Sequence, residues 1–404
     1  MSESRVVIVG AGPGGLAAAL ATHRVGLQTT ILERYHEVRA AGNILNLWPP
    51  PQKVLQLLGV DTHDLGAPVH SVFANHRGRI RADVRLPDEV VREYGGGFIG
   101  LLRPGLYRRM LEALPPEVLR VDHRVTGFTE DGRRVLVHVD GRADIEADVL
   151  IGADGINSLV RERLWGVEPI REQNLHLVGG YLLADGEQPA EGVISHNRDT
   201  QGSYTAIRHE GRGGYEWWVL RAWPHDKPFT EDLKVYAARY AAPFGEPLTS
   251  LIADTPPEHL QRWPIRDRKP LKQWSRGRVT LLGDAAHPTS PYAAYGAGMS
   301  IEDGYFLARE LSAVDLTNAS QVRAALQAYE DRRKPHTAKM SQLAYHNGVM
   351  FHRLPRALAP LRDLIFDHTP FLQKVIGDQM PSDIVSQLAE IEDPEPMDPG
   401  RPRR

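Results

Sequence analysis

The first residues of this chain constrain its fold more strongly than any other stretch. Val6–Val9 are four β-branched residues in a row, which is typical of a buried strand. Gly10, Gly12 and Gly15 follow as a G-x-G-x-x-G turn, and the small residues of Leu16–Ala21 open a helix. In this arrangement the glycines let the backbone turn sharply and approach a pyrophosphate, while the helix N-terminus offers free N–H groups. The stretch predicts the first half of a dinucleotide-binding unit.

The next segment completes that pattern. Thr29–Leu32 reads as a second strand and leads directly into Glu33, about 20 residues beyond the glycines. An acid at that distance accepts a hydrogen bond from a ribose hydroxyl in dinucleotide-binding folds. The sequence therefore predicts an α/β fold that begins with a Rossmann-like dinucleotide site.

Composition narrows the class of protein. A chain of 404 residues, 42% of them hydrophobic, is long enough for two or three folding units. A formal net charge of −3 gives no reason to expect nucleic acid or a membrane as partner. There is no cysteine, which excludes disulfides, thiolate catalysis and cysteine-ligated metals, and we expect no metal site. The chain lacks a secretory signal pattern and any apolar run near the roughly 18 residues of a membrane helix, so we expect a cytoplasmic protein.

The middle of the chain favours β-structure and its end favours helices. Residues 68–100 alternate apolar and polar, which predicts strands, and Ser203–Arg208 with Tyr215–Arg221 predict a hairpin. Near the C-terminus the spacing predicts separate helices over Val322–Arg333 and Thr337–Phe351. Residues 390–404 are rich in Asp-Pro, Glu-Pro and Arg-Pro pairs and are expected to be disordered.

Two further strand-to-turn motifs lie far from the first. Ala147–Ile151 runs into Gly152-Ala153-Asp154-Gly155, and Val279–Leu282 runs into Gly283-Asp284-Ala285-Ala286-His287-Pro288. Together with the glycine turn, these motifs resemble those of the class A flavoprotein monooxygenases, the single-component aromatic hydroxylases typified by p-hydroxybenzoate and salicylate hydroxylases. The similarity runs over residues 5–345.

The resemblance implies a particular domain organisation. A Rossmann-like FAD-binding domain would be discontinuous, formed by residues 1–70, 101–170 and 266–350. A β-rich substrate domain, from residues 71–100 and 171–265, would be inserted into it and cover the flavin. Residues 351–389 would form a C-terminal helical segment.

The resemblance also implies the cofactors and the residues that hold them. FAD would be bound, NADH or NADPH would be a transient reductant, and O₂ would be the co-substrate. Glu33 and Arg103 would approach the adenosine side, and Asp284 would hold the ribityl chain. The positions that match the family's FAD pattern are Gly10, Gly12, Pro13, Gly14, Gly15, Glu33, Arg34, Arg39, Arg103, Asp154, Gly283, Asp284, Pro291 and Gly296.

The implied chemistry is carried by the cofactor. Reduced flavin reacts with O₂ to form a C4a-hydroperoxide, which must be shielded from water and can hydroxylate an electron-rich ring. We expect an aromatic or polycyclic small molecule as substrate, and a monomer or homodimer. Asn46, Tyr204, Trp217, Pro291 and Tyr295 are the candidates for the substrate-facing surface.

The sequence departs from the family at several positions. In the loop Pro291–Gly296, Ala294 stands where a glycine is usual and Tyr295 where a glutamine is usual. Ile44 replaces a second glycine in the early loop, and Asn46 matches a position where some relatives carry a histidine base. An amide cannot accept that proton, and His287 is expected to be structural. The catalytic residues are therefore unknown at this stage.

Other outcomes share the same motifs. An epoxidation or a Baeyer–Villiger-type oxygenation of a natural-product intermediate would use the same flavin chemistry. A flavin-fold binding or escort protein without catalysis is the alternative from another class. A flavin-dependent halogenase is disfavoured because the chain has no W-x-W-x-I-P segment.

Overall fold

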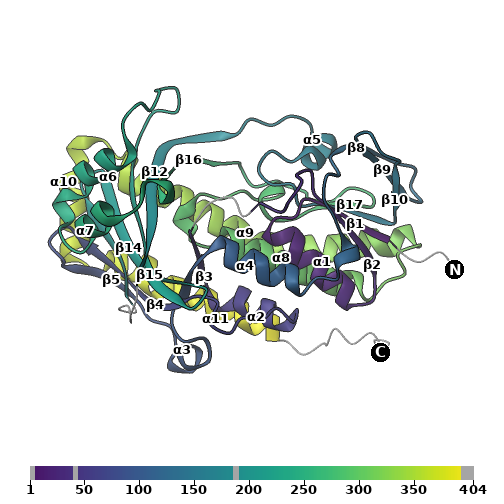
Figure 1. Ribbon diagram of the computed structural model, residues 1–404, viewed down its shortest axis with the longest axis horizontal. Helices are drawn as coiled ribbons and strands as arrows, with labels where there is room; N and C mark the ends of the chain where they lie inside the picture. Colours follow the sequence, from purple (N-terminus) through teal and green to yellow (C-terminus); the bar gives the residue numbers. More distant parts are fainter. Residues whose placement is uncertain (1–4, 40–43, 185–190, 393–404) are drawn as a thin grey trace.

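The computed structural model describes residues 5–39, 44–184 and 191–392. Figure 1 shows two regions side by side, with a parallel sheet and its helices on the right and a large sheet on the left. The long helices α8 (Gly296–Leu311) and α9 (Ala319–Gly348) run between these regions. No helix in the described part of the chain is long and apolar enough to cross a bilayer.

The first region is built on a parallel sheet of five strands in the order β17-β11-β1-β2-β7. Helices cover its strands, so they carry continuous apolar runs rather than alternating ones. The strands are β1 (Arg5–Val9), β2 (Gln28–Leu32), β7 (Leu119–Arg120), β11 (Val149–Gly152) and β17 (Val279–Leu281). This confirms the predicted Rossmann-like α/β unit.

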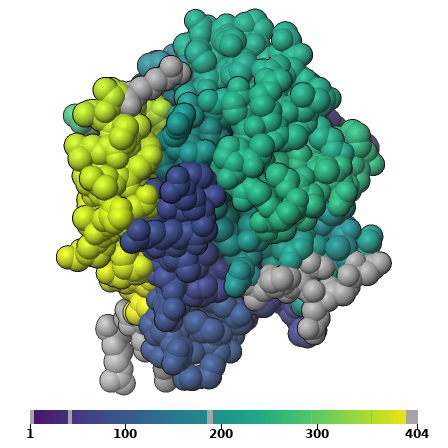
Figure 2. Space-filling view, turned by 90° about the vertical axis from the view of Figure 1, so that its left-hand side faces the viewer, coloured from purple at the N-terminus to yellow at the C-terminus, as the bar shows by residue number. Residues whose placement is uncertain are grey.

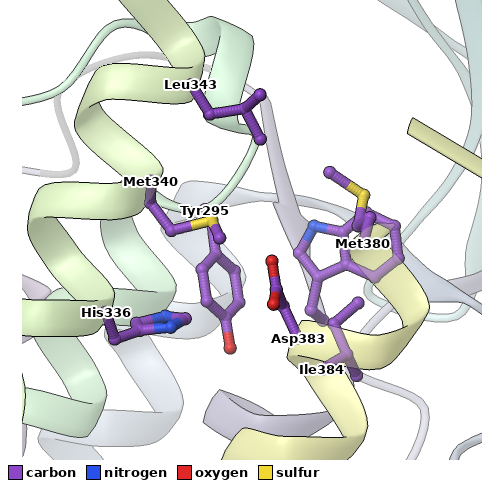
Figure 3. Close-up of a pocket in the computed structure, with 8 residues that line it drawn as sticks. Tyr295, His336, Met340, Leu343, Met380, Asp383 and Ile384 are labelled. Carbon is purple, nitrogen blue, oxygen red and sulfur yellow. The ribbon is translucent and has the colours of Figure 1, made fainter. Parts of the chain in front are cut away.

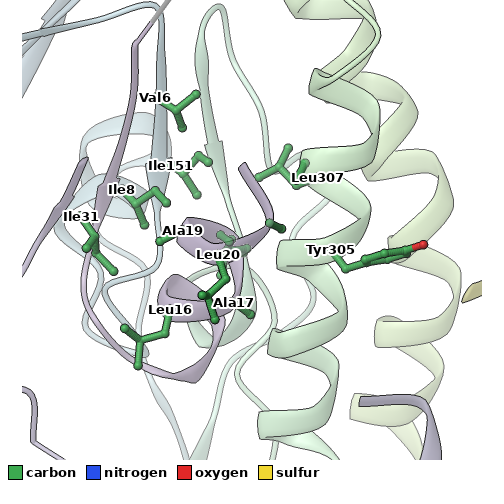
Figure 4. Packing of buried hydrophobic residues seen from close by; sticks show 14 of the residues in the cluster. Val6, Ile8, Leu16, Ala17, Ala19, Leu20, Ile31, Ile151, Tyr305 and Leu307 are labelled. Carbon is green, nitrogen blue, oxygen red and sulfur yellow. The ribbon is translucent and has the colours of Figure 1, made fainter. Parts of the chain in front are cut away.

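Helix α1 (Pro13–Arg24) packs between this sheet and α8 (Figure 4). A Cβ added at Gly304 of α8 would lie 2.5 Å from the Ala18 nitrogen, so glycine allows the two helix backbones to approach closely. Leu16, Leu20 and Leu307 fill the space around this contact and are at most 4% exposed. The rigid packing fixes where the N-terminus of α1 points.

A small antiparallel sheet and three helices complete this region. The sheet has the order β10-β9-β8. Its strands are β8 (Val125–Glu130), β9 (Val135–Val139) and β10 (Ile145–Ala147), and the helices are α2 (Pro49–Leu57), α4 (Arg103–Glu112) and α5 (Leu159–Trp165).

The second region is a mixed nine-stranded sheet made from two separated parts of the chain. Its order is β16-β12-β15-β14-β13-β4-β6-β3, with β5 paired to β4. The strands are β3 (Ile44–Leu47), β4 (Ala67–Asn75), β5 (Ile80–Val84), β6 (Phe98–Leu102), β12 (Arg171–Ala184), β13 (Glu191–Asn197), β14 (Thr200–His209), β15 (Arg212–Ala222) and β16 (Gln261–Asp267). The hairpin predicted over 203–221 is the β14–β15 pair. Because β3 and β4 belong here, this sheet begins earlier in the chain than the predicted boundary at residue 71.

Helices α6 (Leu233–Ala241) and α7 (Leu248–Asp254) cover the outer face of this sheet (Figure 1). Tyr236 and Ile252 from these helices pack against Val178, Trp217 and Val219 of the strands, and all five side chains are fully buried. The opposite face looks toward the parallel-sheet region.

Two local predictions were wrong. The stretch 68–100 includes a helix, α3 (Asp88–Tyr94), which has acids in its first turn and Gly95 at φ +78° as its C-cap. The two helices expected on either side of Pro335 form the single helix α9. A proline removes one backbone bond, but Arg333, Thr337 and Met340 are buried on both sides of it and hold the helix together.

The C-terminal segment is helical, with α10 (Ala359–His368) and α11 (Gln379–Glu392). In Figure 2 it forms one flank of the molecule in yellow, beside the blue strands of the large sheet. Of the stretch predicted to be disordered, 390–392 end α11, and 393–404 lie outside the described residues.

Candidate cofactor and substrate site

The glycine turn after β1 is shaped by its neighbours. Gly10 has φ +101°, and a Cβ there would lie 2.6 Å from the Ala153 carbonyl oxygen. A Cβ at Gly15 would lie 1.9 Å from the Gly10 carbonyl oxygen, so α1 starts directly against the turn. At Gly12, by contrast, a Cβ would meet no atom of the protein within 4 Å. The open space therefore lies on the side of Gly12 on which a phosphate group would approach.

The N-terminus of α1 adjoins that space. Gly12 is its N-cap, no side chain caps it, and Pro13 occupies the first turn, where a missing N–H costs nothing. Uncapped N–H groups and the positive end of the helix dipole suit a pyrophosphate. The structure thus fits the phosphate-binding role predicted for Gly10–Gly15.

Glu33 lies at the end of β2, next to the turn. Its Oε2 accepts a hydrogen bond from the Ala11 N–H at 2.9 Å, and its Oε1 accepts one from the Tyr35 N–H at 3.0 Å. These bonds fix the carboxylate and leave each oxygen a lone pair for a ribose hydroxyl. The exposed Arg34 and Arg39 guanidinium groups lie 4.7 and 4.1 Å from the centre of the Tyr35 ring.

Three charged residues from distant segments meet around Tyr107 in α4. Burial raises the pKa of the Tyr107 hydroxyl, the charge of Arg103 lowers it, and the charges of Asp284 and Glu33 raise it. Arg103 begins the same helix, and its Nε donates to the Ile44 carbonyl oxygen at 3.4 Å. Three residues predicted to hold FAD, Glu33, Arg103 and Asp284, are therefore all close enough to Tyr107 for their charges to affect its pKa.

Asp284 itself has the environment expected of a ligand-holding carboxylate. Its side chain is exposed, whereas its neighbours Gly283 and Ala285 are buried. Surrounding protein nevertheless raises its pKa by desolvation, which the charges of His287 and Arg103 oppose. A carboxyl that reaches solvent while protein surrounds it lies in a concave part of the surface.

Asp154 follows Ala153, the residue that contacts Gly10, and its carboxylate is hydrogen-bonded to the start of α5. Its Oδ1 accepts from Ser158 Oγ at 2.5 Å, and its Oδ2 accepts from the N–H groups of Leu159 and Val160 at 2.7 and 3.2 Å. Burial raises its pKa and these hydrogen bonds oppose that shift. Its visible contribution is to begin α5 and to hold the turn whose Ala153 carbonyl oxygen abuts Gly10.

A buried ionic network supports the Asp284 turn, and the sequence reading missed most of it. Asp303 accepts from the Gly283 N–H at 3.0 Å and contacts His287 Nε2 at 2.5 Å and Arg333 Nε at 2.8 Å. Burial opposes ionisation of Asp303, but His287 and Arg333 outweigh it and lower the pKa to about 2. His287 therefore takes part in positioning the turn. Two adjacent acids, Glu302 and Asp303, in the mainly apolar first part of α8 were the available signal.

Three of the five substrate-surface candidates lie elsewhere. Trp217 is fully buried, and its Nε1 donates to Thr255 Oγ1 at 2.7 Å on the α6–α7 side of the large sheet. Tyr204 is its cross-strand neighbour and packs in the same cluster. Tyr295 is 6% exposed, and its hydroxyl donates to Glu302 Oε1 at 2.6 Å. Successive side chains of a strand point to opposite faces of the sheet. Tyr204 and Trp217 therefore lie on the α6–α7 face, and their neighbours Thr205 and Glu216 lie on the other face.

The remaining candidates, Asn46 and Pro291, lie closer to the cofactor residues. Asn46 is in β3, two residues after the Ile44 carbonyl that binds Arg103. Pro291 is exposed at the start of the loop that follows the Asp284 turn. In that loop Ala294 has φ +47°, and its carbonyl oxygen accepts from Trp48 Nε1 at 3.0 Å. Ala294 thus keeps the left-handed conformation that the usual glycine would adopt without strain.

Glu216 in β15 is a site residue that sequence reasoning missed. It is 2% exposed, and burial raises its pKa to about 8 against the effect of a hydrogen bond with the Asn46 side chain. The signal was a single acid in the apolar and aromatic run Tyr215-Glu216-Trp217-Trp218-Val219-Leu220.

A small apolar pocket lies behind Tyr295 (Figure 3). His336 and Met340 of α9 line it on one side, and Asp383 and Ile384 of α11 on the other. None of the residues around Tyr107 lines it, so this pocket belongs to the helical support and not to the cofactor site.

Comparison with known proteins defines the class. Residues 3–344 match the protein family described as FAD binding domain. The chain is 30% identical over 366 residues to 6-hydroxynicotinate 3-monooxygenase from Pseudomonas fluorescens, covering 86% of this chain and 92% of that protein. It is 28% identical over 374 residues to 3-hydroxybenzoate 6-hydroxylase from Klebsiella oxytoca, covering 86% and 89%. The structure of Klebsiella pneumoniae HpxO with FAD and uric acid shares the fold, with a TM-score of 0.83 at 24% identity over 95% of this chain and 97% of the other.

The chain is therefore a flavoprotein, and FAD is its cofactor. Within that class it belongs to the FAD-binding-domain family as a class A FAD-dependent monooxygenase of the aromatic-hydroxylase type. This confirms the family predicted from the three turn motifs and disfavours the non-catalytic alternative.

Proposed function

We propose that this protein is a single-component monooxygenase that takes electrons from NADH or NADPH and uses O₂ to hydroxylate an aromatic or polycyclic small molecule. The observation that carries the proposal is the open space at Gly12, at the uncapped start of α1, with the Glu33 carboxylate held next to it by the Ala11 N–H. Glu33, Arg103 and Asp284 come from three distant parts of the chain and match the family's FAD pattern.

The residues present fit FAD along its length. The N–H groups at the start of α1 would bind the pyrophosphate, Glu33 the ribose of the adenosine half, and Asp284 the ribityl chain. Arg103 would add positive charge beside the anionic cofactor. Bound FAD supplies the redox chemistry, accepting a hydride and transferring one oxygen atom from O₂.

The large sheet would supply the substrate side of the site. Two names among the relatives, 6-hydroxynicotinate 3-monooxygenase and 3-hydroxybenzoate 6-hydroxylase, refer to flat rings that carry a hydroxyl group. The face of the sheet that bears Glu216 and Asn46 can cover such a ring and exclude water. A monomer or homodimer remains the expected assembly.

The test begins with the absorption spectrum of the purified protein, which should show bound flavin. NADH and NADPH oxidation is then measured with 3-hydroxybenzoate, 6-hydroxynicotinate, 3-amino-4-hydroxybenzoate and urate, followed by mass spectrometry of the products. The proposal expects at least one compound to accelerate oxidation and gain one oxygen atom. Flavin-free protein, or oxidation that none of these rings accelerates, would contradict it.

A further inference from the structure

Glu216 lies on the face of the large sheet that looks toward the cofactor residues. Its neighbours in sequence, Tyr215 and Trp217, pack with the cluster under α6 and α7 on the opposite face. Trp218 and Leu220, on the same face as Glu216, form one hydrophobic cluster with Tyr292 from the loop after the Asp284 turn. The carboxyl group of Glu216 therefore belongs to the inner side of the sheet.

Among the described residues, Asn46 is the side chain that forms a hydrogen bond with this carboxyl group. Asn46 belongs to β3, and its Oδ1 has no hydrogen-bond partner in the described structure, so its Nδ2 makes the bond to Glu216. Asn46 thereby fixes one carboxyl oxygen of Glu216. An additional pairing joins β14 to β6, so β15 and β3 are separated by these two strands, and the bond spans them on the inner face.

The second carboxyl oxygen is left unpaired. Glu216 Oε2 is buried and has no hydrogen-bond partner among the described residues, and neither has Asn46 Oδ1. An unpaired buried acceptor is destabilising, so native proteins rarely keep one without a use. Two such atoms on a bonded pair, on the inner face of the sheet, mark a place for a ligand that donates hydrogen bonds.

We propose that Glu216, held by Asn46, accepts the proton of a ring O–H or N–H group of the substrate. The inference rests on the proposed hydroxylase function and supplies the base that position 46 lacks. In the step, the O–H or N–H bond of the substrate breaks, the proton binds Glu216 Oε2, and the electron pair stays on the substrate. The added electron density makes the ring a better acceptor of the oxygen atom that the flavin chemistry provides.

The electrostatics of the pair suit this role. Burial raises the pKa of Glu216 to about 8, the Asn46 hydrogen bond opposes the shift, and no charged side chain contributes to it. Its cross-strand neighbours are Thr205 and Tyr181, which are uncharged near neutral pH. The deprotonated form of Glu216, whose share grows as the pH rises toward 8, is a stronger base than an ordinary glutamate and its pKa is closer to that of a phenolic hydroxyl, which favours proton transfer.

The same surroundings restrict the substrate class. Like charges close together in a buried site disfavour ionisation, and within the described part of the chain no cation contributes to the pKa of Glu216. The part of the substrate that meets Glu216 is therefore a neutral donor, a hydroxyl or ring N–H, and any carboxylate on the ring must lie away from it.

The test uses Glu216→Gln in the FAD-loaded protein, with Glu191→Gln, at the exposed first residue of β13, as the matched control. The probe is whichever of the four aromatic compounds most stimulates the wild type. We expect Glu216→Gln to keep FAD and bind the probe, while kcat/KM falls roughly 100-fold or more, the usual contribution of a general base. The pH profile of kcat/KM in the wild type should rise toward the raised pKa of Glu216, about 8, and Glu216→Gln should lose that rise. The control should match the wild type.

A second variant tests the positioning role of Asn46. Its hydrogen bond lowers the pKa of Glu216, so Asn46→Leu should move the basic rise of kcat/KM with pH to higher pH, whereas a merely structural residue would not shift it. A kcat/KM of Glu216→Gln within about threefold of the wild type, below what a base contributes, or a pH profile that keeps the same rise, would overturn the assignment. If wild type also fails with every aromatic compound, the proposed function fails as well, so the two failures are distinguishable.

Discussion

Replacing Gly12 by alanine should weaken the binding of FAD without destabilising the folded protein. Gly12 has φ −72° and ψ 178°, which alanine adopts freely, and its Cβ would meet no protein atom within 4 Å. The apoprotein should therefore be as stable as wild type, or more stable by about 0.4–1 kcal/mol because the unfolded chain loses freedom. If the open space is where the pyrophosphate binds, the added methyl group overpacks that contact by about 1–3 kcal/mol. FAD affinity should then fall about 5- to 150-fold.

The assay combines urea unfolding of the FAD-free protein with fluorescence titration of FAD. Gly127→Ala, in β8 and away from the site, is the matched control, since its Cβ would meet only atoms at 3.8 Å or beyond. Gly15→Ala should instead prevent folding, because its Cβ would lie 1.9 Å from a backbone oxygen. A Gly12→Ala protein that binds FAD as tightly as wild type would refute the placement of the pyrophosphate.

Further variants test other parts of the structure. Trp217→Phe should lower stability by about 1–3 kcal/mol through loss of the bond to Thr255, with kcat/KM nearly unchanged; a large kcat/KM effect would return Trp217 to the substrate surface. Ala294→Gly should raise stability by up to about 1 kcal/mol in urea unfolding by relieving φ +47°, and a clear loss would contradict the strain. Between the ordinary glutamate pKa of 4.5 and about 8, the folded state holds the Glu216 proton that the unfolded state has lost. Wild-type stability should therefore decline as pH rises through that window, and Glu216→Gln, measured by urea unfolding at each pH, should remove this component.

Local motifs predicted the Rossmann-like fold of the cofactor half and FAD as its cofactor. The β1 turn, Glu33 and the Asp284 turn each carry their geometry within a few residues, because strand, tight turn and helix start are set by neighbouring positions. Tertiary support was not predictable in the same way. Asp303 and Arg333 join two helices across 30 residues, and no local pattern fixes such a pair.

Predicting which side chains of the large sheet face the substrate requires knowing which face of the sheet is covered by helices, and the sequence of a strand does not show this. The hairpin at 203–221 was predicted correctly, but Tyr204 and Trp217 were assigned to the inner face. Because side chains alternate between the two faces of a strand, assigning one residue to the wrong face also misassigns its neighbours. Helices α6 and α7 decide it, since they cover the face that bears Trp217. Glu216 followed only once β15 and β3 were seen to meet through Asn46. The helix break expected at Pro335 failed for a similar reason, because packing on both sides outweighs one lost backbone bond.

The most direct test of the central claim follows the oxygen atom. FAD-loaded protein is given NADH or NADPH and each aromatic compound under isotopically heavy O₂, and the products are weighed by mass spectrometry. The account predicts one heavy oxygen atom in a hydroxylated product, formed in step with nicotinamide oxidation. Nicotinamide oxidation that yields only hydrogen peroxide with every compound, and no labelled product, would contradict it.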